Sequence, residues 1–269
     1  MRFEINIHLL YRHQNAHLLS YVYTRKDIQM NKSLILLGLC ATGNVFAADE
    51  VKPFSMDGEF GFIATTGNTK TTSIKAKLSA HQELTNWSND YTIEALYKKD
   101  EISNVEQTTA QKYFLSGQGN YKLENPDHRI FGFASYEDDR FSSFNYQATL
   151  AAGWSQKVWE DDTSQFSYSI GPGYSLAETS EGEEQNGLIT RAALDYQWKI
   201  SDTANFKQLL STEVGSDNTK SKSETSVSAQ ISGGLSLKVS LILDHNSDVA
   251  DDIESLDTQT AVTLVYSFF

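Results

Sequence analysis

Apolar and polar residues alternate with a period of two along most of the chain after residue 50. Ile74, Ala76 and Leu78, for example, alternate with lysines and serines, and residues 235–243 repeat the pattern. This period places one kind of side chain on each face of a β-strand. It predicts about twelve strands, near residues 55–66, 70–84, 87–100, 108–122, 128–140, 144–159, 164–177, 186–199, 204–215, 223–232, 235–247 and 257–269.

The predicted strands are long for a soluble sheet, where strands of about 5–6 residues are usual. They match the roughly 9–11 residues with which a tilted strand crosses a bilayer. A soluble sandwich would solvate the polar face and bury the apolar one, whereas a transmembrane barrel turns the apolar face to lipid. Hydrophobic residues make up 39% of the chain and aromatic residues 12%. No apolar stretch approaches the ~20 residues of a membrane-spanning helix.

The lengths of the predicted connections favour the barrel, because outer-membrane barrels have short periplasmic turns and longer outer loops. Counted from a periplasmic N-terminus, the longer connections fall outside, at 100–107, 177–187, 216–223 and 247–256. The shorter ones fall inside, around 86, 125–127, 161–162, 201–202 and 233–234. The outer connections at 66–68 and 139–145 are short, so the rule holds in part.

Aromatic residues gather near the predicted strand ends, at Trp87, Tyr91, Tyr97, Tyr121, Trp154, Trp159, Trp198, Tyr266 and Phe268. Such girdles lie at bilayer interfaces, although ordinary strand propensity also favours aromatic residues. The chain ends on a strand with Leu264, Tyr266, Phe268 and Phe269, which we expect the barrel-assembly machinery to recognise. The alternating apolar residues end at Phe268 and not at the last residue, so it stays open whether this machinery recognises Phe268 or Phe269.

The N-terminal region predicts export. Residues 30–47 combine Lys32, an apolar run and a small residue at Ala47, as a cleaved signal peptide does, although a core helix would share the apolar run. Residues 1–29 precede Met30 and are interpreted as an upstream extension or a mis-assigned start, with a genuine long leader as the alternative. Residues 48–269 then form the outer-membrane barrel. Cleavage would remove the single cysteine and lower the net charge from −13 to −16, because residues 1–47 carry five basic and two acidic groups.

Several short motifs occur in order along residues 56–269. They include Gly58-Glu59-Phe60-Gly61-Phe62, residues 65–69, residues 136–141, residues 171–174 and the C-terminal residues 262–268. In this order they resemble the YdiY-like family of salt-induced outer membrane proteins, whose function is uncharacterised. The resemblance implies an outer-membrane β-barrel, loosely linked to salt stress by the family's name, and brings no catalytic residues with it.

Charged residues lie on the polar face of the predicted strands, at Lys75, Lys77, Glu94, Lys98, Lys112, Arg191, Asp195, Lys199, Glu213, Glu224 and Lys238. From these we predict a lumen lined by Lys75, Glu94, Lys98, Arg191, Asp195, Lys199 and Glu224. A barrel of eight strands has a lumen filled by side chains, and a barrel of sixteen has an aqueous channel. A barrel of twelve strands is therefore intermediate in width. The first hypothesis is a structural or envelope-stress barrel of unknown molecular activity. The alternative is a narrow pore or transporter for ions or small solutes. A soluble acidic β protein of the periplasm is a further reading.

Catalysis has one weak candidate. Asp138-Asp139 and Asp244-His245 each end a predicted strand near the outer rim, where omptin-type surface proteases hold aspartate and histidine pairs that activate water. The rest of that pattern is missing, and no metal, phosphate-loop or cofactor motif is found. The sequence therefore predicts a protein that is not an enzyme and holds no cofactor.

The partners expected from sequence are outer-membrane lipid, lipopolysaccharide and the export and barrel-assembly machinery. The acidic balance argues against nucleic acid, which a basic surface would bind. Two predicted outer loops are rich in carboxylates, at Glu178, Glu181, Glu183, Glu184 and at Asp248, Asp251, Asp252, Glu254, Asp257. Solvated loops are the simpler reading, and weak binding of divalent cations is the functional one.

Overall fold

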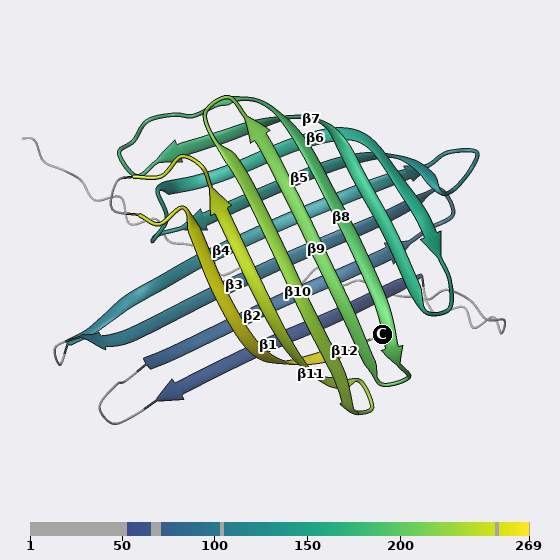
Figure 1. The fold of residues 1–269 in the computed structure, drawn as a ribbon, viewed down its shortest axis with the longest axis horizontal. Coiled ribbons are helices and arrows are strands. Elements are labelled where there is room, and N and C mark those ends of the chain that lie inside the picture. The colour runs from purple at the N-terminus through teal and green to yellow at the C-terminus, as the bar shows by residue number, and fades with distance from the viewer. Residues whose placement is uncertain (1–52, 66–70, 103–104, 251–252, 269) are drawn as a thin grey trace, which may run out of the picture. The chain divides into compact units, whose positions relative to one another are not determined.

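A computed structural model of the chain describes residues 53–65, 71–102, 105–250 and 253–268. These residues form one closed antiparallel barrel in which each strand pairs with its neighbours in sequence and β1 pairs with β12 (Figure 1). The strands are β1 (Phe54–Thr65), β2 (Thr71–Glu83), β3 (Trp87–Ile102), β4 (Val105–Lys122), β5 (His128–Asp139), β6 (Phe144–Glu160), β7 (Ser164–Thr179), β8 (Gly187–Ser201), β9 (Ala204–Gly215), β10 (Thr219–Ser232), β11 (Leu235–Asn246) and β12 (Leu256–Ser267).

The predicted fold class, an antiparallel transmembrane β-barrel of about twelve strands, is confirmed. Two predicted connections are wrong. Residues 100–107 are almost entirely strand, because a bulge between Lys98 and Lys99 shifts the register there and interrupts the period of two. Residues 216–223 are shortened by β10, whose first residues are polar on both faces and therefore lack the alternation.

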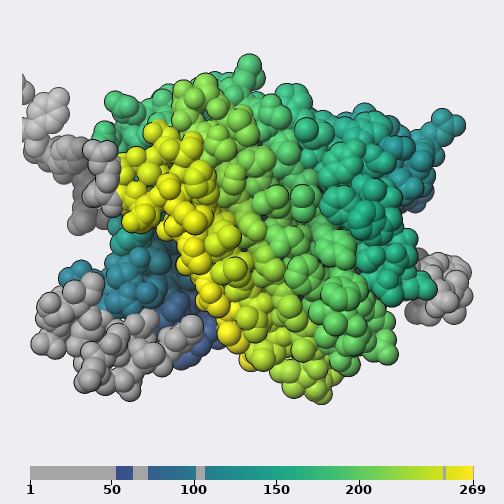
Figure 2. All heavy atoms as spheres, viewed as in Figure 1, coloured from purple at the N-terminus to yellow at the C-terminus, as the bar shows by residue number. Residues whose placement is uncertain are grey.

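The two faces of the barrel wall carry opposite chemistry. Large apolar side chains point outward and are about half exposed, as at Phe60 (53%), Leu150 (58%) and Val262 (51%). Charged side chains on the inner face are buried, as at Lys75 (4%) and Glu94 (7%). Figure 2 shows the outer face of β8–β12, whose strands lie side by side from green to yellow. A soluble protein would bury the first set and expose the second, so the wall is built for lipid outside.

Aromatic rings cluster at the end of the barrel that carries the short turns. Trp87 and Tyr121 meet with ring centroids 5.2 Å apart, and Tyr266 and Phe268 meet at 5.1 Å. A longer row runs from Phe166 and Trp159 through Tyr196 to Phe206. The turns at this end span 84–86, 123–127, 161–163, 202–203 and 233–234. Short turns beside an aromatic girdle are typical of the periplasmic end of outer-membrane barrels, so we take this end as the inner one.

The barrel closes through its shortest strand pairing. Four registered pairs join β1 to β12, from Asp57 with Ser267 to Phe60 with Leu264. Beyond them, residues 61–65 are registered with β2 and residues 256–263 with β11. The hydroxyl of Thr263 donates to the Glu59 carboxylate at 2.8 Å, which ties the two strands together at the point where their ladder ends.

No helix in the described part of the chain is long and apolar enough to cross a membrane. The predicted signal peptide at 30–47, the extension at 1–29 and Phe269 lie outside the described residues and stay predictions. Leu264, Tyr266 and Phe268 lie at the inner end with their side chains 46–50% exposed. The assembly role proposed for this C-terminal strand likewise stays a prediction.

Candidate functional site

The lumen holds an inner charge layer, which we define as Glu59, Lys77, Glu224 and Lys238. Lys77 lies 3.0 Å from Glu224, and Lys238 lies 2.7 Å from Glu224 and 3.0 Å from Glu59. Their side chains are 7–14% exposed. Because Lys77 stands on β2 and Glu224 on β10, with β1, β12 and β11 between them, the bond between these two residues crosses the lumen, whereas Lys238 on β11 joins Glu224 from the neighbouring strand.

An outer charge layer lies nearer the outer loops and consists of Lys112, Glu137, Lys220 and Asp244. Lys112 on β4 lies 3.2 Å from Glu137 on β5 and 3.4 Å from Asp244 on β11. Lys220 on β10 lies 2.8 Å from the other oxygen of Glu137 and donates to Gln147 at 2.6 Å. Two of these bonds join opposite walls, since β4 and β5 are several strands from β10 and β11 in either direction.

A third group stands on the wall formed by β5 to β9. The guanidinium of Arg191 lies over the ring of Phe133, 3.6 Å from its centroid, and its Nε lies 3.5 Å from Glu213. The hydroxyl of Thr149 donates to Glu213 at 2.8 Å. The ammonium of Lys222 on β10 lies 4.9 Å from the ring centroid of Phe114 on β4, so this contact crosses the lumen. The rings of Phe133 and Phe114 therefore contact the cations of Arg191 and Lys222, in addition to the carboxylates near them.

These side chains reach into the space between the strands. A small cavity near the outer end measures about 30 Å³ and is lined by polar groups that include Gln147, Thr149, Glu213 and Lys220. That volume holds one or two water molecules. Phe131, 1% exposed, adds an apolar side chain to the interior. The described lumen thus carries paired charges that several strands contribute.

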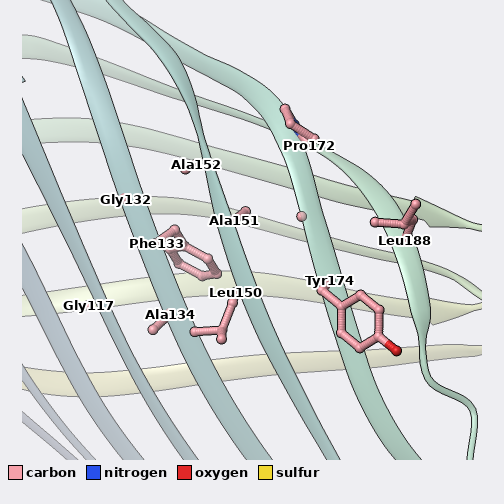
Figure 3. A pocket seen from close by; sticks show the side chains of 11 residues that line it. Gly117, Gly132, Phe133, Ala134, Leu150, Ala151, Ala152, Pro172, Tyr174 and Leu188 are labelled. Atoms are coloured by element: carbon pink, nitrogen blue, oxygen red, sulfur yellow. The ribbon is translucent and has the colours of Figure 1, made fainter.

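A larger hollow of about 620 Å³ lies on the outside of the wall (Figure 3). Its lining is apolar, with small residues such as Gly132 and Ala152 beside Leu150, Tyr174 and Leu188. Leu188 is 77% exposed. This hollow opens among outward-facing side chains, and the Tyr174 hydroxyl is the main polar group among the side chains that line it.

Four of the seven predicted lumen residues lie buried inside the barrel, namely Lys75, Glu94, Arg191 and Glu224. Lys75 and Glu94 pair at 3.5 Å on neighbouring strands.

The other three lie closer to the barrel ends, and their side chains are 30–47% exposed. Lys98 pairs with Asp100 at 2.9 Å, Asp195 with Lys207 at 3.5 Å and Lys199 with the turn residue Asp202 at 2.9 Å. The structure therefore does not bring these three to the cross-lumen contacts.

The sequence analysis missed part of both layers. Lys77, Lys112 and Lys238 were placed on the polar face but left out of the predicted lumen set, and Glu59, Glu137, Lys220, Lys222 and Asp244 were absent from both. Strand parity was the available signal for Glu59, which alternates with the outward Phe60. Lys220 and Lys222 alternate with serines, so the start of β10 shows no apolar face.

The candidate catalytic pairs do not form one site. Lys112 lies between Asp139, at 3.7 Å, and Asp244, at 3.4 Å, so a cation already engages both carboxylates. His245 follows Asp244 in a strand and therefore points to the opposite face of the wall. Within the described residues, no group of three or more His, Cys, Asp or Glu side chains is arranged to hold a metal ion.

The acidic loops are partly outside the described residues, which omit Asp251 and Asp252. Among the rest, Glu178 accepts a hydrogen bond from Asn145 at 2.7 Å and Asp248 accepts one from Gln185 at 2.7 Å. These carboxylates are bonded to amides of neighbouring loops. Binding of divalent cations to the loops stays a prediction.

The chain is similar to a protein family of unknown function, to one uncharacterized protein and to solved outer-membrane proteins. A family model described as a protein of unknown function, DUF481, matches residues 58–268. The uncharacterized protein YdiY of Escherichia coli K12 is 26% identical over 243 residues, which cover 86% of this chain and 94% of that protein. The NanC porin is similar in structure over 78% of this chain and 98% of its own, with a TM-score of 0.49 and 8% identity. An outer membrane channel from Pseudomonas putida F1 is similar over 84% of this chain and 100% of its own, with a TM-score of 0.47 and 8% identity.

Proposed function

The chain belongs to the DUF481 family, and we propose that this β-barrel of the bacterial outer membrane is closed in its resting state and serves the envelope as a structural component. The observation that carries the proposal is the pair of charge layers, whose bonds join opposite walls of the lumen. Lys77 to Glu224 and Lys112 to Asp244 each join strands that are not neighbours. A permeating ion would have to separate such pairs and pass between them.

The salt bridges of the two charge layers are shielded from bulk water. The Lys77 and Glu224 side chains are 12% and 9% exposed, so screening by dissolved salt is weak there. Removing one partner would leave the other charge buried and unpaired, which costs several kcal/mol. Opening the lumen therefore requires a rearrangement that re-pairs or hydrates these groups together. This supports a barrel that excludes solutes at rest.

Conductance of the purified protein in planar lipid bilayers tests the closed state. We expect no stable conductance steps at about ±100 mV, against the steps of a porin inserted under the same conditions. Steady conductance of the unaltered barrel would overturn the proposal. A strain lacking the gene tests the structural role separately: we expect higher leakage of large antibiotics through its outer membrane, restored by the intact gene.

A narrow gated pore for ions or small solutes is the second candidate. The observation in its favour is that the lumen is filled by side chains of the wall itself, with ionisable groups of both signs, and a polar cavity already opens near the outer end. Side chains can swing aside without unfolding a strand. Voltage-dependent steps that appear in the unaltered protein and change their ion selectivity in Lys112→Met would support this reading over the first.

A further inference from the structure

The outward face of β10 carries three neutral polar side chains in a row, which Gln208 and Thr212 on β9 extend on either side of the exposed Leu210. We define this hydroxyl ladder as Gln208, Thr212, Ser221, Ser223 and Thr225. Strand alternation fixes its direction: Lys222 and Glu224 on β10 point into the lumen, so the residues between them point out.

The members of the ladder bond to one another across the two strands. The Gln208 amide donates to the Ser223 hydroxyl at 3.0 Å, and the Thr225 hydroxyl donates to the Gln208 carbonyl oxygen. Thr212 and Ser221 lie 2.9 Å apart through their hydroxyl oxygens. Each hydroxyl can accept two hydrogen bonds and donate one, and the amide has four sites. Both amide hydrogens of Gln208 are used, by the Ser223 hydroxyl and by the Leu209 carbonyl oxygen, so the bonding capacity that is left over lies mainly on the hydroxyl groups.

The ladder stands at the height of the lipid hydrocarbon. The register runs from Phe206 with Val227, at the inner aromatic girdle, through Gln208 with Thr225 to Thr212 with Ser221. A strand tilted by 35–45° climbs about 2.5 Å per residue, so the ladder spans roughly 5–15 Å above the girdle. The apolar band of such barrels is about 25 Å tall. The ladder thus lies in its lower and middle part.

Strands β5, β6 and β7 show what lipid contact selects at the same height. There Ile130, Leu150 and Ile170 are all about half exposed, and Leu150 aligns with Ala134 and Tyr174. Lipid cannot form hydrogen bonds with a hydroxyl in the hydrocarbon region, and polar groups there cost free energy. Between membrane-spanning elements, however, Ser, Thr and Gln side chains form hydrogen bonds that hold the elements together.

We infer that the hydroxyl ladder is an intramembrane contact surface for a second copy of this chain. Every ladder group both donates and accepts, and none is charged, so the surface is complementary to itself without repulsion. A two-fold axis through β9 and β10 would place two identical patches face to face, as in the commonest homodimers. The short serine side chains also allow two walls to approach closely.

Cross-linking of single cysteines tests this in isolated outer membranes. On a Cys40→Ser background, Ser223→Cys is compared with Ala152→Cys, whose exposed position lies on β6, away from the ladder. A bismaleimide spanning ~10 Å is expected to convert Ser223→Cys, and not Ala152→Cys, to a species of twice the mass. Equal cross-linking of both, none at Ser223→Cys, or a product with a different protein would overturn the inference.

A matched polar-to-apolar variant gives an independent readout. Copies bearing two different affinity tags are co-expressed, and recovery of one tag with the other is measured in mild detergent. Ser223→Ala with Thr225→Val should reduce that recovery about tenfold, while heat-modifiable migration shows that the barrel still folds. Leu150→Ala on β6, away from the ladder, should leave recovery unchanged. Recovery that the ladder variant does not reduce would contradict the inference.

Discussion

The ammonium of Lys77 lies 3.0 Å from the carboxylate of Glu224, although the two residues are 147 positions apart and stand on non-neighbouring strands. Lys238 binds the other oxygen of the same carboxylate at 2.7 Å. One glutamate thus holds lysines from two sides of the lumen. Glu224 is therefore the residue on which the inner charge layer depends most.

Replacing Glu224 with glutamine should destabilise the barrel by about 2–4 kcal/mol, because two poorly exposed lysines lose their shared counter-charge. Lys238 keeps Glu59, so the loss falls mainly on Lys77. Urea unfolding in lipid vesicles, followed by tryptophan fluorescence, measures the change. Adding Lys77→Met should restore part of the stability, as a double-mutant cycle reveals.

The control for this prediction is Asp202→Asn, at a pair whose aspartate is 96% exposed and bonds Lys199 at 2.9 Å. An exposed pair contributes about 0–1 kcal/mol, so this variant should unfold almost as the unaltered protein does. An equal loss of unfolding free energy in Asp202→Asn and Glu224→Gln would show that burial in the lumen does not make the ion pairs of Glu224 more stabilising than an exposed pair.

The stack of Arg191 on Phe133 makes a second energetic prediction. The guanidinium lies 3.6 Å from the ring centroid, and its side chain is 7% exposed. Arg191→Lys keeps the charge but loses the planar contact, and we expect a loss of about 1–2 kcal/mol in the same unfolding assay. Phe133→Leu should cost a similar amount. The combined variant should cost less than the sum, whereas strict additivity would contradict the stacking contact.

Gly153 and Gly171 mark the closest approach of two strands, β6 and β7. A Cβ on Gly153 would lie 2.4 Å from the Ile170 carbonyl oxygen and 2.6 Å from the Gly171 Cα, both backbone atoms. Gly153→Ala must therefore move the strands apart, and we expect a loss of about 2–4 kcal/mol or failure to fold. Heat-modifiable migration on gels measures the folded fraction.

Gly132→Ala is the matched control, since a Cβ there meets nothing within 4 Å. We expect its folded fraction to equal that of the unaltered barrel, because surface substitutions usually stay within about 0.5 kcal/mol. If Gly153→Ala folded as well as Gly132→Ala, the close approach of β6 and β7 would not be a constraint on the fold.

Strand alternation predicted the barrel because lipid outside and charge inside impose the same period on nearly every strand. It failed where that contrast is missing. In the first half of β10, lysines alternate with serines and threonines, so both faces are polar and the strand start was placed near residue 223 instead of Thr219. Ser221, which belongs to the hydroxyl ladder, is one of the polar residues because of which the start of this strand was placed too late.

The cross-lumen pairs could not be read from the chain. Parity shows that Lys112 and Asp244 each face inward, but their contact at 3.4 Å depends on how far the strands are staggered around the barrel. A shift of two residues in register keeps every side chain on its face and changes every partner. Four of the seven predicted lumen residues are buried. Which charged residue pairs with which across the lumen, however, is known only from the structure.

The turn between β6 and β7 gives a prediction that depends on pH. Hydrogen bonds from the Thr163 hydroxyl and from the backbone amides of Thr163 and Ser164 lower the pKa of Asp161 to about 2 from its ordinary value of 3.8. A lowered pKa means that the folded state favours the ionised carboxyl. The turn's contribution is therefore complete above about pH 4 and is lost as the pH falls from 3.8 through 2.

Asp161→Ala should accordingly unfold at a lower temperature than the unaltered barrel at pH 7, and the difference should shrink toward zero between pH 4 and pH 2. Thermal unfolding in detergent, recorded by circular dichroism at several pH values, measures it. Asp162→Ala is the control, because the Asp162 carboxylate is exposed and the three hydrogen bonds named above are all accepted by Asp161. A difference for Asp161→Ala that is independent of pH would show that the side chain stabilises the turn by a means other than its ionised carboxylate.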